Sequence, residues 1–253
     1  MVHPKKRLGQ HFLTDPSIAE RIVSSLEAVP QDAVVEIGPG KGILTQFLMS
    51  KDIRLIPVEI DRESVAYLLK KWPALEEEML EADILKLNWS DKLPESMHII
   101  GNFPYNISSQ IFFKVLENKD QVNRVVCMLQ KEVALRLVSP PGSKAYGILS
   151  VLLQAFFDIS YLFSVKPGSF FPPPKVQSGV IILERNKRAK LDCDEKLFFS
   201  VVKQTFNHRR KTIRNSLKTK LLNLDTDSVL LTKRPEQLTV SEFVELTKLV
   251  QPA

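Results

Sequence analysis

Cysteine is scarce in this sequence. Only Cys127 and Cys193 occur among its 253 residues, and no CxxC pair is present. Two isolated thiols argue against a disulfide-built scaffold and against a cysteine-ligated zinc site, and they are typical of a protein kept reduced in the cytosol. The four histidines, at positions 3, 11, 98 and 208, lack the spacing of metal ligands. We therefore expect no metal site.

Long hydrophobic runs are also missing. The longest apolar stretch, residues 148–157, contains Gln154 and is too short to cross a bilayer. No apolar segment follows the basic N-terminus, as it would in a signal peptide. We expect a cytoplasmic protein with no membrane partner. The sequence shows neither an internal repeat nor a low-complexity tract.

Positive charge is unevenly placed. The net charge is +6, and the basic residues gather at positions 5–7 and again between 185 and 220. Either cluster alone is compatible with an ordinary solubilising face. Two clusters that flank a ligand pocket would instead indicate a polyanionic partner such as nucleic acid.

A glycine loop between a strand and a helix marks the first recognisable unit. Residues 33–37 form a short β-rich run, the loop 38–42 has the sequence Gly-Pro-Gly-Lys-Gly, and residues 43–49 suit a helix. A second strand, 53–58, ends in Glu59, about twenty residues past the loop. This spacing is typical of nucleotide-binding α/β units, where the acid binds ribose hydroxyls.

Strands and helices continue to alternate after this unit. Further strands are predicted at 78–82, 97–100, 122–129, 159–165 and 180–183, and helices at 64–71, 107–116, 131–138 and 146–157. The pattern predicts an α/β fold with a mostly parallel seven-stranded sheet covered by helices on both faces. Ligands of such sheets bind at the carboxyl ends of strands. Gly38, Glu59, Asp83 and Asn102 each stand at such an end.

The segment Asn102-Phe103-Pro104-Tyr105 directly follows a predicted strand. Tyr105 offers a stacking face, and the Asn102 amide offers an acceptor and two donors, a combination that suits a flat, hydrogen-bonding ring. A plain turn is the alternative for this segment alone, because Asn and Pro are common turn residues.

Three regions lie outside the regular α/β pattern. Residues 1–16 form a basic arm that ends in Asp15-Pro16, and residues 170–176 form a rigid proline loop that presents aromatic residues and Lys175. After residue 183 the chain becomes helical, and Thr239 and Glu242 have capping-box spacing before a last helix. We expect a sheet domain at 1–186 and a small all-helical domain at 187–253.

Two cofactors fit the acid-bearing strand ends. NAD would use Glu59, but the loop departs from GxGxxG and a dehydrogenase has no use for the Asn102 segment. S-adenosylmethionine needs the same ribose contact from Glu59 and a polar contact to its adenine, for which Asp83 is placed. A second planar amine beside Asn102 and Tyr105 would then be the methyl acceptor.

With these motifs the sequence resembles the ribosomal RNA adenine dimethyltransferases that modify two adjacent adenosines near the 3′ end of small-subunit rRNA. The resemblance covers nearly the whole chain. Its motifs are 9–13 (GQHFL), 36–40 (EIGPG), 59–61 (EID), 82–83 (AD), 102–105 (NFPY), 130–134 (QKEVA), 171–176 (FPPPKV) and 206–215. The sequence departs from the family at Phe103, usually Leu or Ile, and at His11, where Asn is common.

The resemblance implies a Rossmann-like methyltransferase domain, S-adenosylmethionine as cofactor, and specific site residues. It places the cofactor against His11, Leu13, Gly38, Glu59, Asp83 and Asn102. The target adenine would be flipped out of its stack and held between Tyr105 and Phe171.

A mechanism follows from the chemistry of the acceptor. An aromatic amine is a poor nucleophile because its lone pair is delocalised into the ring. If the Asn102 side-chain oxygen and the Pro104 carbonyl accept its hydrogens, the nitrogen pyramidalises and its lone pair points at the sulfonium methyl. No titratable base is required, so catalysis would consist mainly of alignment and electrostatics.

The basic clusters then suit folded rRNA and a small-subunit precursor as partners of a monomeric enzyme. The residues expected to contact RNA are Lys5, Lys6, Arg7, Lys175, Arg209, Arg210, Lys211 and Arg214. Two alternatives stay open. One is a large-subunit rRNA adenine methyltransferase with the same acceptor pocket. The other is a non-catalytic ribosome-assembly or transcription factor on the same fold, against which the intact site residues argue.

Overall fold

The computed structural model describes residues 2–5, 8–220 and 227–250. Its internal contacts divide the chain into two compact units. The sheet unit contains residues 1–134 and 159–185, and the helical unit contains residues 135–158 and 186–253. Within the described residues, no helix is long and apolar enough to cross a membrane.

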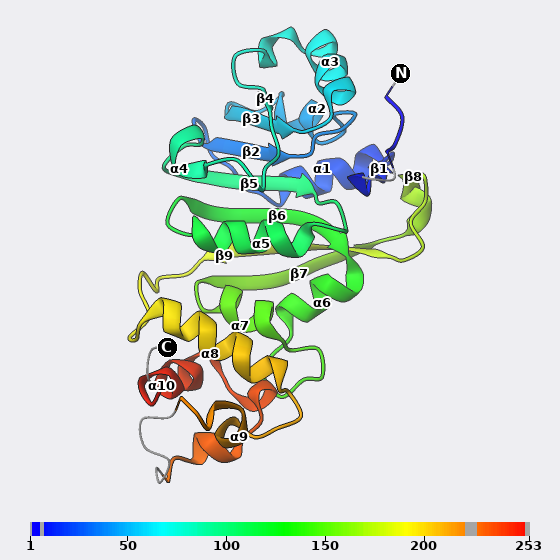
Figure 1. Cartoon of the computed structure of the whole chain (residues 1–253). Helices are drawn as coiled ribbons and strands as arrows, with labels where there is room; N and C mark the ends of the chain where they lie inside the picture. The colour runs from blue at the N-terminus through cyan, green and yellow to red at the C-terminus, as the bar shows by residue number, and fades with distance from the viewer. Residues whose placement is uncertain (1, 6–7, 221–226, 251–253) are drawn as a thin grey trace. The chain divides into compact units, whose positions relative to one another are not determined.

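A seven-stranded sheet forms the centre of the sheet unit (Figure 1). Its strands follow the order β4-β3-β2-β5-β6-β9-β7. The pairs β4–β3, β3–β2, β2–β5 and β5–β6 are parallel, whereas β9 pairs with β6 antiparallel. The strands are β2 (Ala33–Ile37), β3 (Arg54–Glu59), β4 (Leu80–Glu81), β5 (Met97–Asn102), β6 (Val122–Gln130), β7 (Phe157–Val165) and β9 (Ser178–Arg185). The predicted mostly parallel seven-stranded sheet is confirmed.

Helices follow the strands as the alternating pattern predicts. They are α1 (Pro16–Ser24), α2 (Thr45–Leu48), α3 (Arg62–Lys71), α4 (Trp89–Lys92), α5 (Ser108–Glu117) and α6 (Lys131–Val138). Helix α1 starts where the sequence provides a cap, because the Asp15 side chain accepts hydrogen bonds from the N–H groups of Ser17 and Ile18. Helix α2 is shorter than the expected 43–49.

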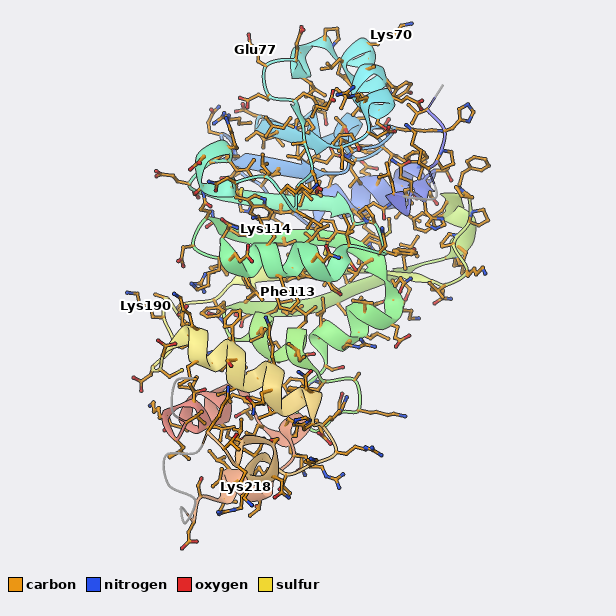
Figure 2. All side chains as sticks on the ribbon, in the orientation of Figure 1. Lys70, Glu77, Phe113, Lys114, Lys190 and Lys218 are labelled. Carbon is orange, nitrogen blue, oxygen red and sulfur yellow. The ribbon has the colours of Figure 1, made fainter. Side chains whose placement is uncertain are left out.

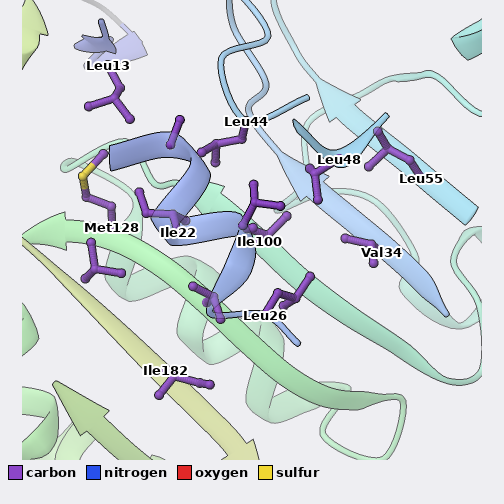
Figure 3. Close-up of a cluster of buried hydrophobic side chains, with 14 of the residues drawn as sticks. Leu13, Ile22, Leu26, Val34, Leu44, Leu48, Leu55, Ile100, Met128 and Ile182 are labelled. Atoms are coloured by element: carbon purple, nitrogen blue, oxygen red, sulfur yellow. The ribbon is translucent and has the colours of Figure 1, made fainter. Parts of the chain in front are cut away.

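Apolar residues of α1 pack on one face of the sheet (Figure 3). Ile22 of α1 and Leu26, just after the end of this helix, share a buried cluster with Val34, Ile100 and Met128 of the central strands. The residues that alternate with these along the same strands point to the opposite face, where α5 lies, and they are also fully buried (Figure 1). Because both faces are covered, most residues of the central strands are apolar. This explains why the sequence predicts them well.

A second, two-stranded pairing joins the N-terminal arm to the proline loop. Strand β1 (Phe12–Leu13) pairs antiparallel with β8 (Phe170–Phe171), with Phe12 opposite Phe171 and Leu13 opposite Phe170. The arm therefore docks onto the loop. This pairing positions both segments beside the sheet.

The helical unit contains α7 (Ile148–Gln154), α8 (Glu195–Asn207), α9 (Ile213–Leu217) and α10 (Val240–Lys248). The Phe206 ring contacts the rings of Tyr146 and Phe243 at centroid distances of 6.2 and 6.0 Å. Thr239 and Glu242 form the predicted capping box of α10, in which the Thr239 side chain accepts from the Glu242 N–H.

Two expectations about this region differ from the structure. The predicted helix 146–157 is only Ile148–Gln154, and Phe157 already belongs to β7. The helical unit is also larger than the expected 187–253, because residues 135–158 belong to it. The physical reason is that α7 packs against α8 and α10. The sequence order conceals this packing, since residues 159–185, which include β8 and β9, separate the two parts.

Candidate active site

Four strand ends border one cavity of about 250 Å³ in the sheet unit. Gly38 follows β2, Glu59 ends β3, Asp83 follows β4 and Asn102 ends β5, and all four line the cavity. Parallel strands present their carboxyl ends at the same edge of a sheet, so residues far apart in sequence meet there. The structure thus brings these four residues, which we call the rim positions, together at one edge of the sheet.

The glycine loop keeps one wall of this cavity open. Gly38 and Gly40 have φ values of +67° and +58°, which glycine adopts without strain. A Cβ added to Gly38 would meet no atom within 4 Å, whereas one at Gly40 would lie 2.7 Å from the Phe12 ring. Gly38 therefore leaves room for a ligand, and Gly40 lets the arm pack closely.

The Glu59 carboxylate holds the loop in place. Its Oε2 accepts the Gly40 N–H at 3.0 Å and its Oε1 accepts the Asp61 N–H at 2.9 Å. Burial raises the pKa of Glu59, and the two backbone donors act in the opposite direction. Each carboxylate oxygen retains a second lone pair, so the group can still accept from a ligand hydroxyl.

Asp83 borders the same cavity from the loop after β4. Its Oδ1 accepts the Leu85 N–H at 3.0 Å, which fixes the turn that carries it. The apolar residues Ile60, Ile84 and Leu85 line the cavity between the two acids. Sequence analysis did not select them, although their positions directly after Glu59 and Asp83 were a usable signal.

The Asn102 amide is oriented by the arm. Its Nδ2 donates to the His11 backbone carbonyl at 2.8 Å. Because a carbonyl oxygen only accepts, this bond determines which end of the amide is the nitrogen, and the Asn102 Oδ1 keeps its acceptor capacity. Pro104 also lines the cavity, and its carbonyl accepts the Ile107 N–H at 3.1 Å.

Phe103, which departs from the family pattern, does not change the site's polarity. Its side chain is 1% exposed, and its ring meets Phe112 edge-on with centroids 5.9 Å apart. The larger side chain is therefore packed toward α5. The polar neighbours Asn102 and Pro104 keep their places on the rim.

Tyr105 lines the cavity and is held on two sides. Its hydroxyl lies 2.6 Å from the Ser178 hydroxyl, and its ring stacks on His11 with a centroid distance of 5.5 Å and an interplanar angle of 30°. Burial raises the pKa of Tyr105, and the Ser178 hydrogen bond opposes that rise. Ser178 was not selected from the sequence, because its partner lies 73 positions away.

Two residues assigned through the resemblance are not in the cavity wall. Leu13 is 4% exposed and packs in the core cluster with α1, whereas its neighbour Phe12 lines the cavity. Successive residues of a strand point to opposite sides, so only one of the two can face the cavity. Phe171 is 59% exposed on β8 and is likewise absent from the lining. Lys175 is exposed on the same loop.

Lys5 is the residue of the basic cluster 5–7 that the structure describes. Lys5 forms ion pairs with the buried Asp61 and with Glu63, and the Asp61 hydrogen bond raises the pKa of Lys5. The Lys5 charge thus fastens the arm to the N-terminus of α3. Lys6 and Arg7 lie outside the described residues.

The basic residues after α8 differ in whether they are hydrogen-bonded within the chain or exposed. Arg209 donates from Nη2 to the carbonyls of Lys144 at 2.8 Å and Ser143 at 3.4 Å, and its Nε lies 3.7 Å from Glu236. Arg210 and Lys211 are exposed, and Arg214 is partly buried in α9. Lys218, also exposed, extends from the same region (Figure 2).

No cluster of three or more His, Cys, Asp or Glu side chains suited to a metal ion occurs within residues 2–5, 8–220 and 227–250. The cavity instead combines a glycine loop, two acids and an oriented amide beside an aromatic ring. Together with the fold, these features define a nucleotide-binding α/β methyltransferase. The chain belongs to the ribosomal RNA adenine dimethylase family, whose model matches residues 1–251. It is therefore an enzyme, a methyltransferase of ribosomal RNA adenine.

Curated relatives cover the whole chain. A protein of Bacteroides thetaiotaomicron named ribosomal RNA small subunit methyltransferase A is 52% identical over 257 aligned positions, which span 100% of this chain and 96% of the relative. The protein of the same name from Parabacteroides distasonis is 55% identical and covers 99% of this chain and 95% of its own length.

Solved structures show the same fold. A dimethyladenosine transferase from Plasmodium falciparum superposes with a TM-score of 0.78 at 24% identity, covering 93% of this chain and 96% of that one. The 23S rRNA methyltransferase ErmE gives a TM-score of 0.70 at 26% identity, covering 94% and 99%. The fold is thus similar to that of a dimethyladenosine transferase and to that of a 23S rRNA methyltransferase.

Proposed function

We propose that this enzyme transfers methyl groups from S-adenosylmethionine to the exocyclic amines of two adjacent adenosines near the 3′ end of small-subunit rRNA. The observation that carries the proposal is the orientation of Asn102. Its amide nitrogen is occupied by the His11 carbonyl, so its oxygen is the group left to accept a hydrogen from an amine beside Tyr105.

The rim residues fit S-adenosylmethionine. The open space at Gly38 admits a ligand close to the backbone, and the carboxylates of Glu59 and Asp83 can accept from ribose hydroxyls and an adenine amine. His11 and Asn102 border the same cavity. When bound there, the cofactor supplies an electrophilic methyl group on a sulfonium.

The chain's own residues align the acceptor. The Asn102 Oδ1 and the Pro104 carbonyl accept the two amine hydrogens, which removes the lone pair from conjugation with the ring. Tyr105 stacks on one face of the base, and Phe171 on the neighbouring proline loop covers the other. Because alignment and electrostatics suffice, no side chain has to act as a base.

Exposed cations supply the contact to RNA phosphates. Arg210, Lys211 and Lys175 are exposed, and we assign them this role together with Arg214. Phosphate contacts of this kind position folded RNA without identifying its sequence. The selectivity for small-subunit rRNA is supported instead by the relatives named small subunit methyltransferase A, which are 52% and 55% identical.

Radiolabelled methyl transfer to separated ribosomal subunits tests the proposal. We expect label in small-subunit particles that lack the modification, and nuclease digestion should release dimethyladenosine. Naked small-subunit rRNA, run in parallel, determines whether a partly assembled particle is needed. Label in large-subunit rRNA would instead indicate a 23S rRNA methyltransferase, as ErmE is named. Absence of label in every RNA would favour an assembly factor.

A further inference from the structure

The proline loop is tied at both ends to one pair of rings. At its start, the Pro172 carbonyl lies 2.8 Å from Nδ1 of His11. At its end, the Ser178 hydroxyl lies 2.6 Å from the Tyr105 hydroxyl. His11 and Tyr105 stack on each other. The chain segment that presents Phe171 is thereby linked to Tyr105 directly, through the Ser178 hydroxyl, and indirectly, through the His11 ring that stacks on Tyr105.

Ser178 is a rigid anchor. It is fully buried and pairs with Gln130 across β9 and β6. The preceding residue is held twice by Lys131, whose N–H donates to the Gln177 carbonyl and whose Nζ donates to the Gln177 side chain, both at 2.9 Å. Since Ser178 does not line the cavity, any effect it has on the reaction passes through Tyr105.

His11 connects three groups of the site. Its Nδ1 must carry the proton, because the Pro172 carbonyl can only accept. Its ring covers one face of Tyr105, and its own carbonyl orients the Asn102 amide. A base stacked on Tyr105 is therefore confined to the face that His11 leaves open.

We propose that Ser178 and the His11 ring are positioning residues, which set the Tyr105 ring at a fixed place relative to Asn102 and the Phe171 loop. The inference rests on the proposed function, in which Tyr105 and Phe171 hold the target adenine. Neither Ser178 nor the His11 ring accepts a hydrogen from the amine. They determine whether that amine reaches the Asn102 oxygen.

A double-mutant cycle between Ser178 and Tyr105 tests the first half. Ser178→Ala and Tyr105→Phe each remove one partner of the hydroxyl pair, and we expect each to slow single-turnover methyl transfer about tenfold at saturating cofactor and RNA. If Ser178 acts through the Tyr105 hydroxyl, the double variant should be no slower than Tyr105→Phe alone. Multiplied rate reductions in the double variant would overturn the inference.

The chain offers a matched control. Tyr161 and Ser164 form a second hydroxyl pair at the same 2.6 Å distance, on β7 and exposed. Ser164→Ala should leave both transfer and cofactor affinity unchanged. Ser178→Thr keeps the hydroxyl and should recover most of the rate that Ser178→Ala loses. If Ser178→Ala fails to fold, Tyr105→Phe alone still decides, because an unchanged transfer rate would show that the hydroxyl pair positions nothing.

His11→Asn tests the second half. It keeps the backbone carbonyl that holds Asn102 but removes the ring that stacks on Tyr105. We expect a several-fold slower single turnover at saturating cofactor and RNA, whatever the change in the cofactor Kd, which calorimetry measures. A weakened Kd with an unchanged rate would overturn the positioning role. Failure of the wild-type chain to methylate small-subunit rRNA would instead contradict the proposed function, so the two failures are distinguishable.

Discussion

At the scale of single residues, Glu36 is the most unusual ionisable group. Its side chain is 1% exposed, and its Oε2 accepts the Thr45 hydroxyl at 2.7 Å. Its Oε1 has no hydrogen-bond partner among the described residues. Burial raises the pKa of Glu36 to about 8, and the nearby Glu59 charge adds to the rise. The folded protein therefore retains a proton on Glu36 at neutral pH.

This burial predicts a pH-dependent stability. Between the ordinary carboxyl pKa of about 4.3 and the folded value, the folded state holds more protons than the unfolded state, so the Glu36 contribution is lost as pH rises through the window. Relative to Glu36→Gln, the wild-type free energy of unfolding should fall by up to about 1.4 kcal/mol per pH unit between about pH 5 and 8. Urea unfolding at several pH values measures this. Parallel curves for the two proteins would contradict it.

For Arg209, residue type alone does not reveal the internal hydrogen bonds of the side chain, and its RNA contact stays a prediction. Its position in a basic run suggested RNA contact, yet its guanidinium donates to two backbone carbonyls of the helical unit. Charge runs do not reveal which members have internal partners, because those partners, residues 143 and 144, lie more than sixty positions away. Ser178 escaped notice for the same reason, since a lone serine carries no local signal.

At the scale of elements, the glycine loop raises the question whether glycine is needed there for the backbone conformation or to leave space for a ligand. Gly38 and Gly142 both have positive φ, +67° and +86°, and an added Cβ meets no atom within 4 Å at either position. Gly38 borders the cavity, whereas Gly142 lies in the helical unit. The two positions therefore make a matched pair.

Alanine should lower the free energy of unfolding equally at both glycines, but it should weaken cofactor binding only at Gly38. We expect Gly38→Ala and Gly142→Ala each to lower the free energy of unfolding by roughly 1–2 kcal/mol, because alanine disfavours this backbone conformation. Only Gly38→Ala should weaken binding of S-adenosylmethionine, by tenfold or more, since its methyl enters the ligand space. Calorimetric Kd values check this. Equal affinities in the two variants would refute a cofactor at this loop.

The elements of the sheet were largely predictable, and the physical reason is burial. Strands such as Ala33–Ile37 and Val122–Gln130 lie between two helical layers, so most of their residues are apolar. The four rim positions were predicted from the carboxyl ends of the strands. The β1–β8 pairing did not, because each strand has two residues and tertiary contact alone creates it.

At the scale of the whole molecule, the basic residues after α8 differ in whether their charge is exposed or bonded within the chain. Arg210 and Lys211 are exposed, whereas the neighbouring Arg209 is bonded to carbonyls. These adjacent residues thus allow the two roles to be separated by mutation.

Removing the two exposed charges should weaken RNA binding and flatten its salt dependence. In Arg210→Ala/Lys211→Ala, the slope of log K against log salt should become shallower by about 1.5, since each phosphate that a cation neutralises contributes about 0.7–0.9 to the slope. Arg209→Ala should instead lower the free energy of unfolding, by about 1–3 kcal/mol. Lys70→Ala, an exposed position on α3 (Figure 2), serves as the control. Salt titrations of RNA binding measure the slopes, and an unchanged slope in the double variant would remove these residues from the RNA surface.

The role of the Asn102 amide is the claim on which the rest depends, and single-turnover methyl transfer to small-subunit rRNA by Asn102→Ala tests it most directly. The variant loses the oxygen that we propose accepts the amine hydrogen but keeps Gly38, Glu59 and Asp83. We predict a rate at least about 100-fold below the wild type, with S-adenosylmethionine still bound. A rate near that of the wild type would contradict the account.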